Sequence, residues 1–181
     1  MANVGPVALL FVDGYNIIGA CPQLTQVRDQ SGLESARHQL AESLVNYAAY
    51  KDFEVRLIFD AYAQPNPRAI EPITHHLSIH YTAFGETADT YIECWCARLR
   101  HHDQRRIVAT SDRAQRLTVI GYGAEWMSAH QLAIDMTTLL QQQRQHHQRQ
   151  RHRGPSPQRF LANSLSPEAQ ERLRQMRNGR A

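Results

Sequence analysis

The sequence predicts an α/β protein with a mostly parallel central sheet flanked by helices. Short apolar segments suited to buried strands alternate with longer segments whose apolar residues recur every three or four positions. This alternation is typical of parallel sheets covered by helices on both faces. The length of 181 residues suits one domain with an appendage, and 42% hydrophobic with 20% charged residues is typical of a globular chain.

The predicted strands are short and mostly apolar. Val7 to Val12 is a continuous apolar run, which fits a strand buried on both faces. A residue pair such as Val55 and Leu57 shows the alternation of a strand, and "AEWMS" fits a short edge strand. In chain order, the predicted strands are 7–12, 53–61, 77–83, 106–112 and 124–128.

The predicted helices carry one apolar stripe each. Ser31 or Gly32 leads into the first of them, and Ser128 with Gln131 forms a capping box before the last. The predicted helices are 32–50, 86–102, 112–120 and 128–140. The polar residues 21–32 are expected to form a loop, as are the proline-containing residues 62–76, with at most a short helix.

The sequence predicts a boundary near residue 140. Residues 140–181 contain nine arginines against two glutamates, whereas residues 1–139 carry 11 basic and 15 acidic side chains. We therefore expect a folded domain over 1–140 and a basic Gln/Arg-rich extension over 141–181. The extension could continue the preceding helix as far as Gly154, and Ser166-Pro167 predicts a short C-terminal helix.

Four aspartates fall where the carboxyl ends of the predicted strands meet. Asp13, Asp60 and Asp112 each follow a strand, and Asp89 lies in the first turn of the helix after the third strand. Ligands bind beyond this edge in open α/β sheets. Carboxylates gathered there repel one another, and a divalent cation relieves that repulsion. Oxygen ligands favour Mg²⁺, and Asn16 adds a neutral oxygen one turn after Asp13.

This set of residues suits the hydrolysis of a phosphodiester by metal-activated water, without a covalent nucleophile. No nucleophile elbow, P-loop or His-Glu-x-x-His motif is found. Each aspartate taken alone also fits a turn or a helix cap. Convergence favours a functional role for Asp13, Asp89 and Asp112, while Asp60 fits a loop-holding role equally well.

Four segments in this order, "LLFVDGYNIIGA", "IFDA", "ETADTYIE" and "VATSD", resemble the YacP-like NYN-domain proteins of the PIN-like nuclease superfamily. The resemblance spans residues 7–140. It implies a PIN-like three-layer sandwich and a Mg²⁺- or Mn²⁺-dependent endoribonuclease that acts on mRNA at the ribosome. It places the acidic site on the residues Asp13, Asp89 and Asp112, supported by Asn16 and Asp60. Glu86 and Glu93 match the motif without an assigned role.

An acidic site needs positive charge nearby to hold RNA. Arg113, Arg116 and Arg68 are candidates near the active edge, although each fits a solvated arginine at least as well. Tyr15 and Tyr62 could stack on bases, and packing explains them equally. The basic extension fits either phosphate contact or an unstructured tail.

Two other functions compete with the nuclease. One is a catalytically inactive RNA- or ribosome-binding module, and the other is a metal-dependent hydrolase of small phosphate esters.

A metal site at Cys94 and Cys96, with His101 and His102 nearby, is the weaker interpretation of those cysteines, since small helix residues explain them. No membrane span, signal peptide or organic cofactor motif is found, so we expect a cytoplasmic protein.

Overall fold

Six strands form one sheet in the part of the chain that the computed structural model describes, residues 5–60 and 67–153. The strands are β1 (Ala8–Asp13), β2 (Phe53–Phe59), β3 (Ala69–Pro72), β4 (Leu77–Tyr81), β5 (Arg106–Ala109) and β6 (Glu125–Met127). The helices are α1 (Gly14–Ala20), α2 (Pro22–Ser31), α3 (Leu33–Lys51), α4 (Ala88–Arg98), α5 (Arg113–Gly121) and α6 (Ala129–Arg153). The chain divides into two units, Met1–Leu140 and Gln141–Ala181.

The sheet is parallel except at one edge. Its strand order is β3-β4-β2-β1-β5-β6, and only β3 runs antiparallel to its neighbour. β1 pairs with β2 on one side and with β5 on the other, in register from Leu9 opposite Glu54 and Arg106. Every residue of β1 is buried, as its continuous apolar run predicts for a central strand.

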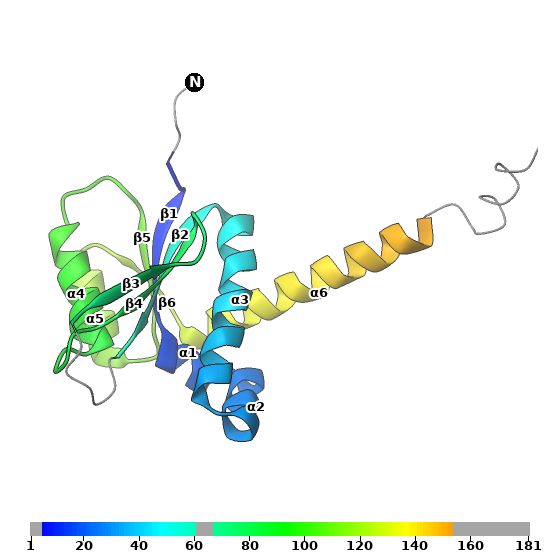
Figure 1. The fold of residues 1–181 in the computed structure, drawn as a ribbon. Helices are drawn as coiled ribbons and strands as arrows, with labels where there is room; N and C mark the ends of the chain where they lie inside the picture. The colour runs from blue at the N-terminus through cyan, green and yellow to red at the C-terminus, as the bar shows by residue number, and fades with distance from the viewer. Residues whose placement is uncertain (1–4, 61–66, 154–181) are drawn as a thin grey trace, which may run out of the picture. The chain divides into compact units, whose positions relative to one another are not determined.

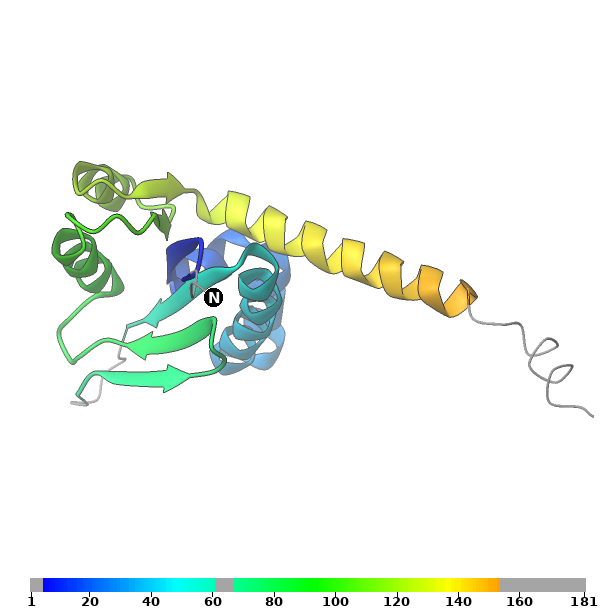
Figure 2. The same ribbon diagram turned by 90° about the horizontal axis from the view of Figure 1, so that it is seen from above.

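Helices cover both faces of the sheet, which gives three layers (Figures 1 and 2). On one face, alternate residues of β1 such as Leu10 pack with α1, α2, α3 and the first turns of α6. On the other face, Leu9 and Phe11 pack with α4 and α5. This architecture confirms the predicted α/β fold with a mostly parallel, helix-flanked sheet.

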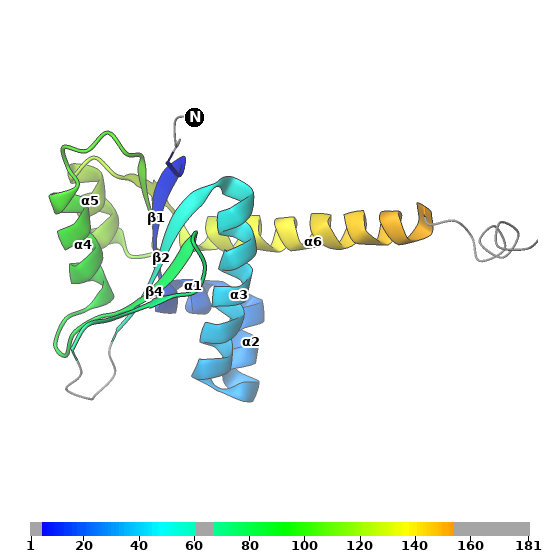
Figure 3. The same ribbon diagram turned by 45° about the horizontal axis from the view of Figure 1, so that its top comes forward.

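The order in which the chain adds strands to the sheet reverses at β1. It adds β2 and β4 on one side, and then crosses to place β5 on the other side of β1. Such a switch point opens a crevice beyond the carboxyl ends of the two strands, which is where open α/β sheets bind ligands. In Figure 3, α1 begins at that end of β1.

Two predicted loops are wrong. Residues 22–31 form α2, because Pro22 at the first helical position suits a helix start and Leu24 supplies a buried contact against the core. Residues 69–72 form β3, an exposed edge strand, and such a strand tolerates Pro72 because its outer side needs no ladder hydrogen bond. Both segments are too polar to show an apolar pattern.

The other predicted strands and helices are confirmed within a few residues. The predicted capping box is half formed: Ser128 Oγ accepts from the backbone N–H of Gln131 at 3.0 Å, whereas the Gln131 side chain donates to Asp135 instead. In the second unit, the described residues continue helix α6 to Arg153, as predicted. The predicted C-terminal helix lies outside the described residues, and the predicted domain over residues 1–140 stays a prediction. None of the described helices is long and apolar enough to span a membrane.

Candidate active site

Asp13 lies at the carboxyl end of the central strand and is 5% exposed. It is also the N-cap of α1. Its Oδ1 accepts from the backbone N–H of Asn16 at 3.1 Å, and its Oδ2 accepts from the Asn16 side-chain amide at 2.6 Å. Two donors from one residue fix both carboxylate oxygens. The observed role of Asn16 is therefore to orient Asp13.

Gly14 follows Asp13 because the backbone there runs against an aromatic ring. A Cβ atom at Gly14 would lie 2.2 Å from the Phe59 ring, which is buried at the end of β2. Any larger residue would force the ring or the start of α1 to move. The Asp-Gly pair thus lets the capping aspartate and the core meet at the same point.

Asp60 and Asp112 also bind helix N-termini. Asp60, directly after β2, accepts a hydrogen bond at Oδ1 from the backbone N–H of Ala88, the first residue of α4. Asp112 is the N-cap of α5 and accepts from the N–H of Gln115 at 2.9 Å. Burial raises the pKa of Asp60, the Ala88 N–H opposes this, and the charge of Asp13 adds to the increase.

Asp89 differs from the other three, because its side chain neither caps a helix nor accepts a hydrogen bond from the described residues. The N-cap of α4 is Thr87, whose side chain accepts from the N–H of Thr90. Asp89 Oδ1 is buried and has no hydrogen-bond partner among the described residues. Burial raises the pKa of Asp89 to about 6, and the negative charges of neighbouring carboxylates add to this increase. Those carboxylates are Asp13, Asp112, Asp60 and Glu93.

The four aspartates therefore lie at one edge of the sheet, and the charges of the other three act on Asp89. None of them forms an ion pair with an arginine or lysine in the described part of the chain. No three His, Cys, Asp or Glu side chains among the described residues form a group that could hold a metal ion as they stand. The donor set still fits a hard cation, since it consists of carboxylate oxygens, one of them buried and unpartnered. The predicted ligand set, Asp13, Asp89, Asp112 and Asp60, stays a prediction.

Glu86 has a partner of its own. Arg68 donates to both of its carboxylate oxygens, at 2.8 Å from Nε, and this contact lowers the pKa of Glu86. The Arg68 guanidinium also lies 5.2 Å from the Tyr91 ring centroid. Glu86 is thus a neutralised structural carboxylate, and Arg68 shares its charge with Glu86. The predicted contact of Arg68 with RNA stays a prediction.

The remaining RNA-binding candidates differ in how far their side chains are engaged by the fold. Arg113 is exposed at the start of α5, whereas the Arg116 guanidinium lies 4.0 Å from the Trp126 ring centroid. Tyr15 packs on Phe59 at 5.2 Å between ring centroids, and its hydroxyl accepts from Arg37. Packing accounts for Tyr15 directly. Tyr62 lies outside the described residues.

Three polar residues near the edge were not identified from the sequence. Buried Thr110 accepts from the Asp112 N–H at 3.0 Å and fixes the turn that carries Asp112. Gln115 is 1% exposed, and neither amide atom has a partner among the described residues. Arg37 reaches Tyr15 from α3. "T-S-D-x-x-Q" could have drawn attention to Thr110 and Gln115 through their spacing to Asp112, whereas nothing local marks Arg37.

Two cysteines, Cys94 and Cys96, lie on α4. Cys96 is buried in the cluster with Ile92 and Val119, and burial raises the pKa of its thiol to about 11. Cys94 is half-buried and free. Within the described residues no metal-binding group of three includes either cysteine. Their positions agree with the prediction of two small helix residues, at least one of them in the core.

Comparison with known proteins places these observations in a family. Residues 10–178 match the family model described as YacP-like NYN domain. The uncharacterized protein YacP of Bacillus subtilis (strain 168) is 34% identical over 131 residues, which cover 72% of this chain and 76% of that protein. Two crystal structures of Rae1 (YacP) from Bacillus subtilis have a similar fold, each with a TM-score of 0.67. One of them, a point mutant, is 27% identical, with 92% of this chain and 98% of that one covered. The other is 28% identical, with 94% and 95% covered.

Proposed function

The chain belongs to the YacP-like NYN domain family, and from this premise we propose that it is a metal-dependent endoribonuclease that cleaves mRNA in association with the ribosome. NYN domains are generally nucleases, and nucleases of this kind typically use divalent metals. The family also suggests RNA as the bound partner. We place the activity in the cytoplasm.

The state of Asp89 carries the proposal. Its carboxylate has no helix to cap, one of its oxygens is buried without a partner among the described residues, and three other aspartates raise its pKa together with burial. A charge held in this way destabilises the fold unless it is protonated or bound by a cation. A structural aspartate would be expected to have a donor, as Asp13, Asp60 and Asp112 do.

The chemistry follows from these oxygen donors. When bound, Mg²⁺ or Mn²⁺ stabilises negative charge on phosphate oxygens and lowers the pKa of a coordinated water. Mg²⁺ is commonly held by one or two carboxylates together with phosphate oxygens and waters. Asp13 and Asp89 would supply those carboxylates. Asn16 holds Asp13 in one orientation, and Asp112, after the neighbouring strand β5, adds a further carboxylate to the edge.

RNA needs positive charge around this acidic edge. Arg113 is exposed directly after Asp112 and takes part in no hydrogen bond or ion pair of the described residues, so it is the best placed of the predicted arginines. The nine arginines after residue 140 offer a second basic region for phosphate contacts. A sequence-independent contact of this kind would suit an RNA held on a ribosome.

The direct test is to incubate the full chain with ribosome-bound and with naked mRNA, with Mg²⁺ or Mn²⁺ and with EDTA, and to map the new RNA ends. We expect internal cuts that EDTA abolishes. Because water and not the RNA 2′-hydroxyl is the nucleophile, an RNA with a 2′-deoxy nucleotide at the mapped site should still be cut. The products should carry no 2′,3′-cyclic phosphate.

Other outcomes of the same experiment would contradict the proposal. RNA that is bound and left intact under all metal conditions would identify a binding module. Turnover of a nucleotide monoester with intact RNA would identify a hydrolase of small phosphate esters. Cuts that persist in EDTA, or that require the 2′-hydroxyl, would exclude hydrolysis by metal-activated water.

A further inference from the structure

One large aromatic side chain at the carboxyl edge is exposed without a structural reason. Phe84 is 64% exposed, and its ring stacks on no other ring among the described residues. It belongs to neither hydrophobic cluster of the fold. A buried aromatic ring contributes to stability, so a ring left in water contributes little to this fold.

The backbone under Phe84 is held in a defined turn. The Glu86 N–H donates to the Ala83 carbonyl at 3.0 Å, and Gly85 has a φ of +80°. This is the pattern of a type II turn with Phe84 at its first central position and glycine at the second, where φ must be positive. The Thr82 hydroxyl donates to the Glu86 carbonyl at 2.8 Å. The turn therefore presents the ring from a fixed base.

The Arg68 and Glu86 pair strengthens the same turn. The Glu86 carboxylate accepts from the Ala83 N–H at 3.2 Å while Arg68 holds its two oxygens. The pair thus has a structural role, and its acidic member follows Phe84 by two residues in the same turn. An aromatic ring and a guanidinium attached to one turn suit a nucleotide, because a base and a phosphate are covalently linked.

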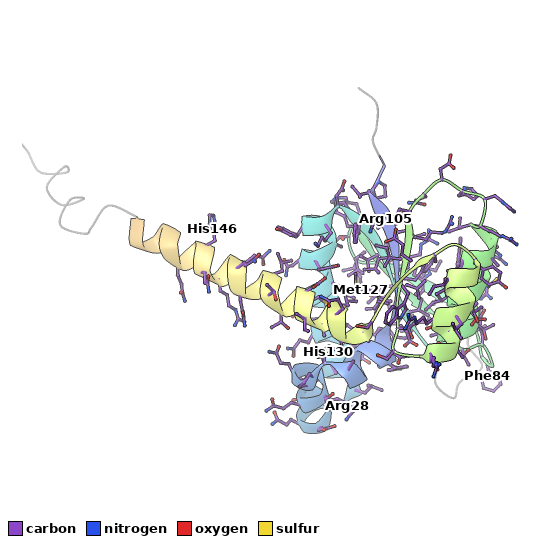
Figure 4. The ribbon with its side chains drawn as sticks, turned by 180° about the vertical axis from the view of Figure 1, so that it is seen from behind. Arg28, Phe84, Arg105, Met127, His130 and His146 are labelled. Carbon is purple, nitrogen blue, oxygen red and sulfur yellow. The ribbon has the colours of Figure 1, made fainter. Side chains whose placement is uncertain are left out.

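The turn connects β4 with α4, the helix that carries Asp89, and it is bonded at both ends to the segment around Asp60. At its start, the Thr82 N–H donates to the Phe59 carbonyl at 3.1 Å, next to Asp60. At its end, the Ala88 N–H donates to Asp60, and Asp89 follows. Figure 4 labels Phe84 at the end of the sheet opposite to Arg105, which precedes β5. Phe84 therefore lies on the active edge.

We propose that Phe84 is a stacking platform for one unpaired base of the RNA that lies across the acidic edge. The inference rests on the proposed function and specifies its substrate as single-stranded RNA. Bases inside a duplex stack on one another, so only an unpaired base can lie on a protein ring. A protein partner would need a contiguous apolar patch. The residues that follow Phe84 in the chain are Gly85, Glu86 and Thr87, none of them a large apolar residue.

The test compares exposed aromatic residues at the two edges of the sheet. Tyr50 is 63% exposed in the last turn of α3, just before β2 begins at the amino edge, and is the matched control for Phe84. Phe84→Ala, Phe84→Leu, Phe84→Trp and Tyr50→Ala are made in the full chain. Affinity for single-stranded and for duplex RNA is measured in an Asp89→Asn background, and cleavage is measured without that substitution.

We expect Phe84→Ala and Phe84→Leu to weaken single-stranded RNA binding about 10-fold or more, in the range of one lost base-stacking contact. Phe84→Trp and Tyr50→Ala should bind as the parent does, and the affinity for duplex RNA should not change in any variant. Cleavage of single-stranded RNA at subsaturating concentration should fall in parallel with binding. Thermal unfolding of all four variants should match the parent, since both rings are exposed.

Three results would overturn the inference alone, given a parent that binds and cuts RNA. The first is unchanged RNA binding by Phe84→Ala, which is also the result expected of a ring that contacts a protein. The second is full RNA binding by Phe84→Leu, which would mean that the ring makes a simple apolar contact. The third is an equal loss of affinity for single-stranded and for duplex RNA. A parent that neither binds nor cuts RNA would overturn the proposed function, and the stacking platform with it.

Discussion

The two edges of the sheet treat their carboxylates differently. At the amino edge, Glu125 pairs with Arg105 through two contacts of 2.7 and 2.8 Å, and Glu54 near the start of β2 pairs with Arg56 at 2.8 Å. At the carboxyl edge, Asp13, Asp60 and Asp112 accept only from backbone N–H groups and one side-chain amide, and Asp89 accepts from nothing among the described residues.

This difference concentrates uncompensated negative charge at one edge of the sheet. Arginine is abundant in the chain, with nineteen of the twenty basic residues, so the lack of arginine partners at the carboxyl edge is not due to scarcity. Glu86 shows that an arginine can be placed there, because Arg68 neutralises it. The four aspartates that the family resemblance assigns to the acidic site and its support have no arginine partner among the described residues, and neither does Glu93.

The largest effect should come from removing charge at the carboxyl edge. We expect Asp13→Asn and Asp89→Asn each to reduce RNA cleavage by about 100- to 1,000-fold, the loss that follows removal of one preorganised charge-stabilising group. Initial rates on a mapped RNA site at saturating Mg²⁺ provide the measurement. Glu125→Gln, at the opposite edge, is the matched control, and cleavage at the wild-type rate by either aspartate variant would break the comparison.

A smaller loss should follow when Asp13 keeps its charge and loses its orientation. Asn16→Ala removes the 2.6 Å hydrogen bond to Asp13 Oδ2, and we expect cleavage to fall by about 10- to 100-fold, as for other residues that position a metal ligand. The same assay at several Mn²⁺ concentrations should show that higher metal restores part of the rate. Asn46→Ala, on the exposed side of α3, is the control and should cut normally.

The burial of Asp89, together with repulsion from the neighbouring carboxylates, should appear as a pH dependence of stability without metal. The pKa of Asp89 rises from 3.8 to about 6 on folding, so the folded state binds more protons than the unfolded state between these values. Stability from this group is therefore full below pH 4 and is lost as the pH rises through 6. Allowing for solvent screening of a half-buried group, the loss amounts to about 1–2 kcal/mol.

Urea unfolding in EDTA between pH 4 and 7 measures this loss as the difference between the wild type and Asp89→Asn. The free energy of unfolding of Asp89→Asn should increase relative to that of the wild type as the pH rises. A difference that stays constant across this range would mean that neither burial nor the neighbouring carboxylates raise the pKa of Asp89.

The smallest effect should come from the amino edge. Glu125→Gln breaks an exposed ion pair, and we expect the free energy of unfolding to fall by less than about 1 kcal/mol. Because Glu125 lies at the far end of the sheet from the aspartates, RNA cleavage should not change. Thermal unfolding at low and high salt would measure the pair, since salt screens it. A loss of cleavage would mean that the two edges are not independent.

The fold and the acidic edge could be predicted because they depend on local patterns. A buried run such as residues 7–12 indicates a strand, and parallel topology brings the residues after each strand to one edge. The polar helix α2 and the edge strand β3 could not be predicted, because few of their residues are buried. The partner of Glu86 could not be predicted either, since it lies 18 residues away in a loop that carries no pattern.

The most direct measurement is Mn²⁺ binding to the full chain, detected through the electron paramagnetic resonance signal of free Mn²⁺. The wild type, Asp89→Asn and Glu125→Gln are compared. We expect the wild type and Glu125→Gln to bind with the same affinity, and Asp89→Asn to bind at least about 10-fold more weakly. Absence of specific Mn²⁺ binding by the wild type, or equal binding by Asp89→Asn, would contradict a cation site at the carboxyl edge.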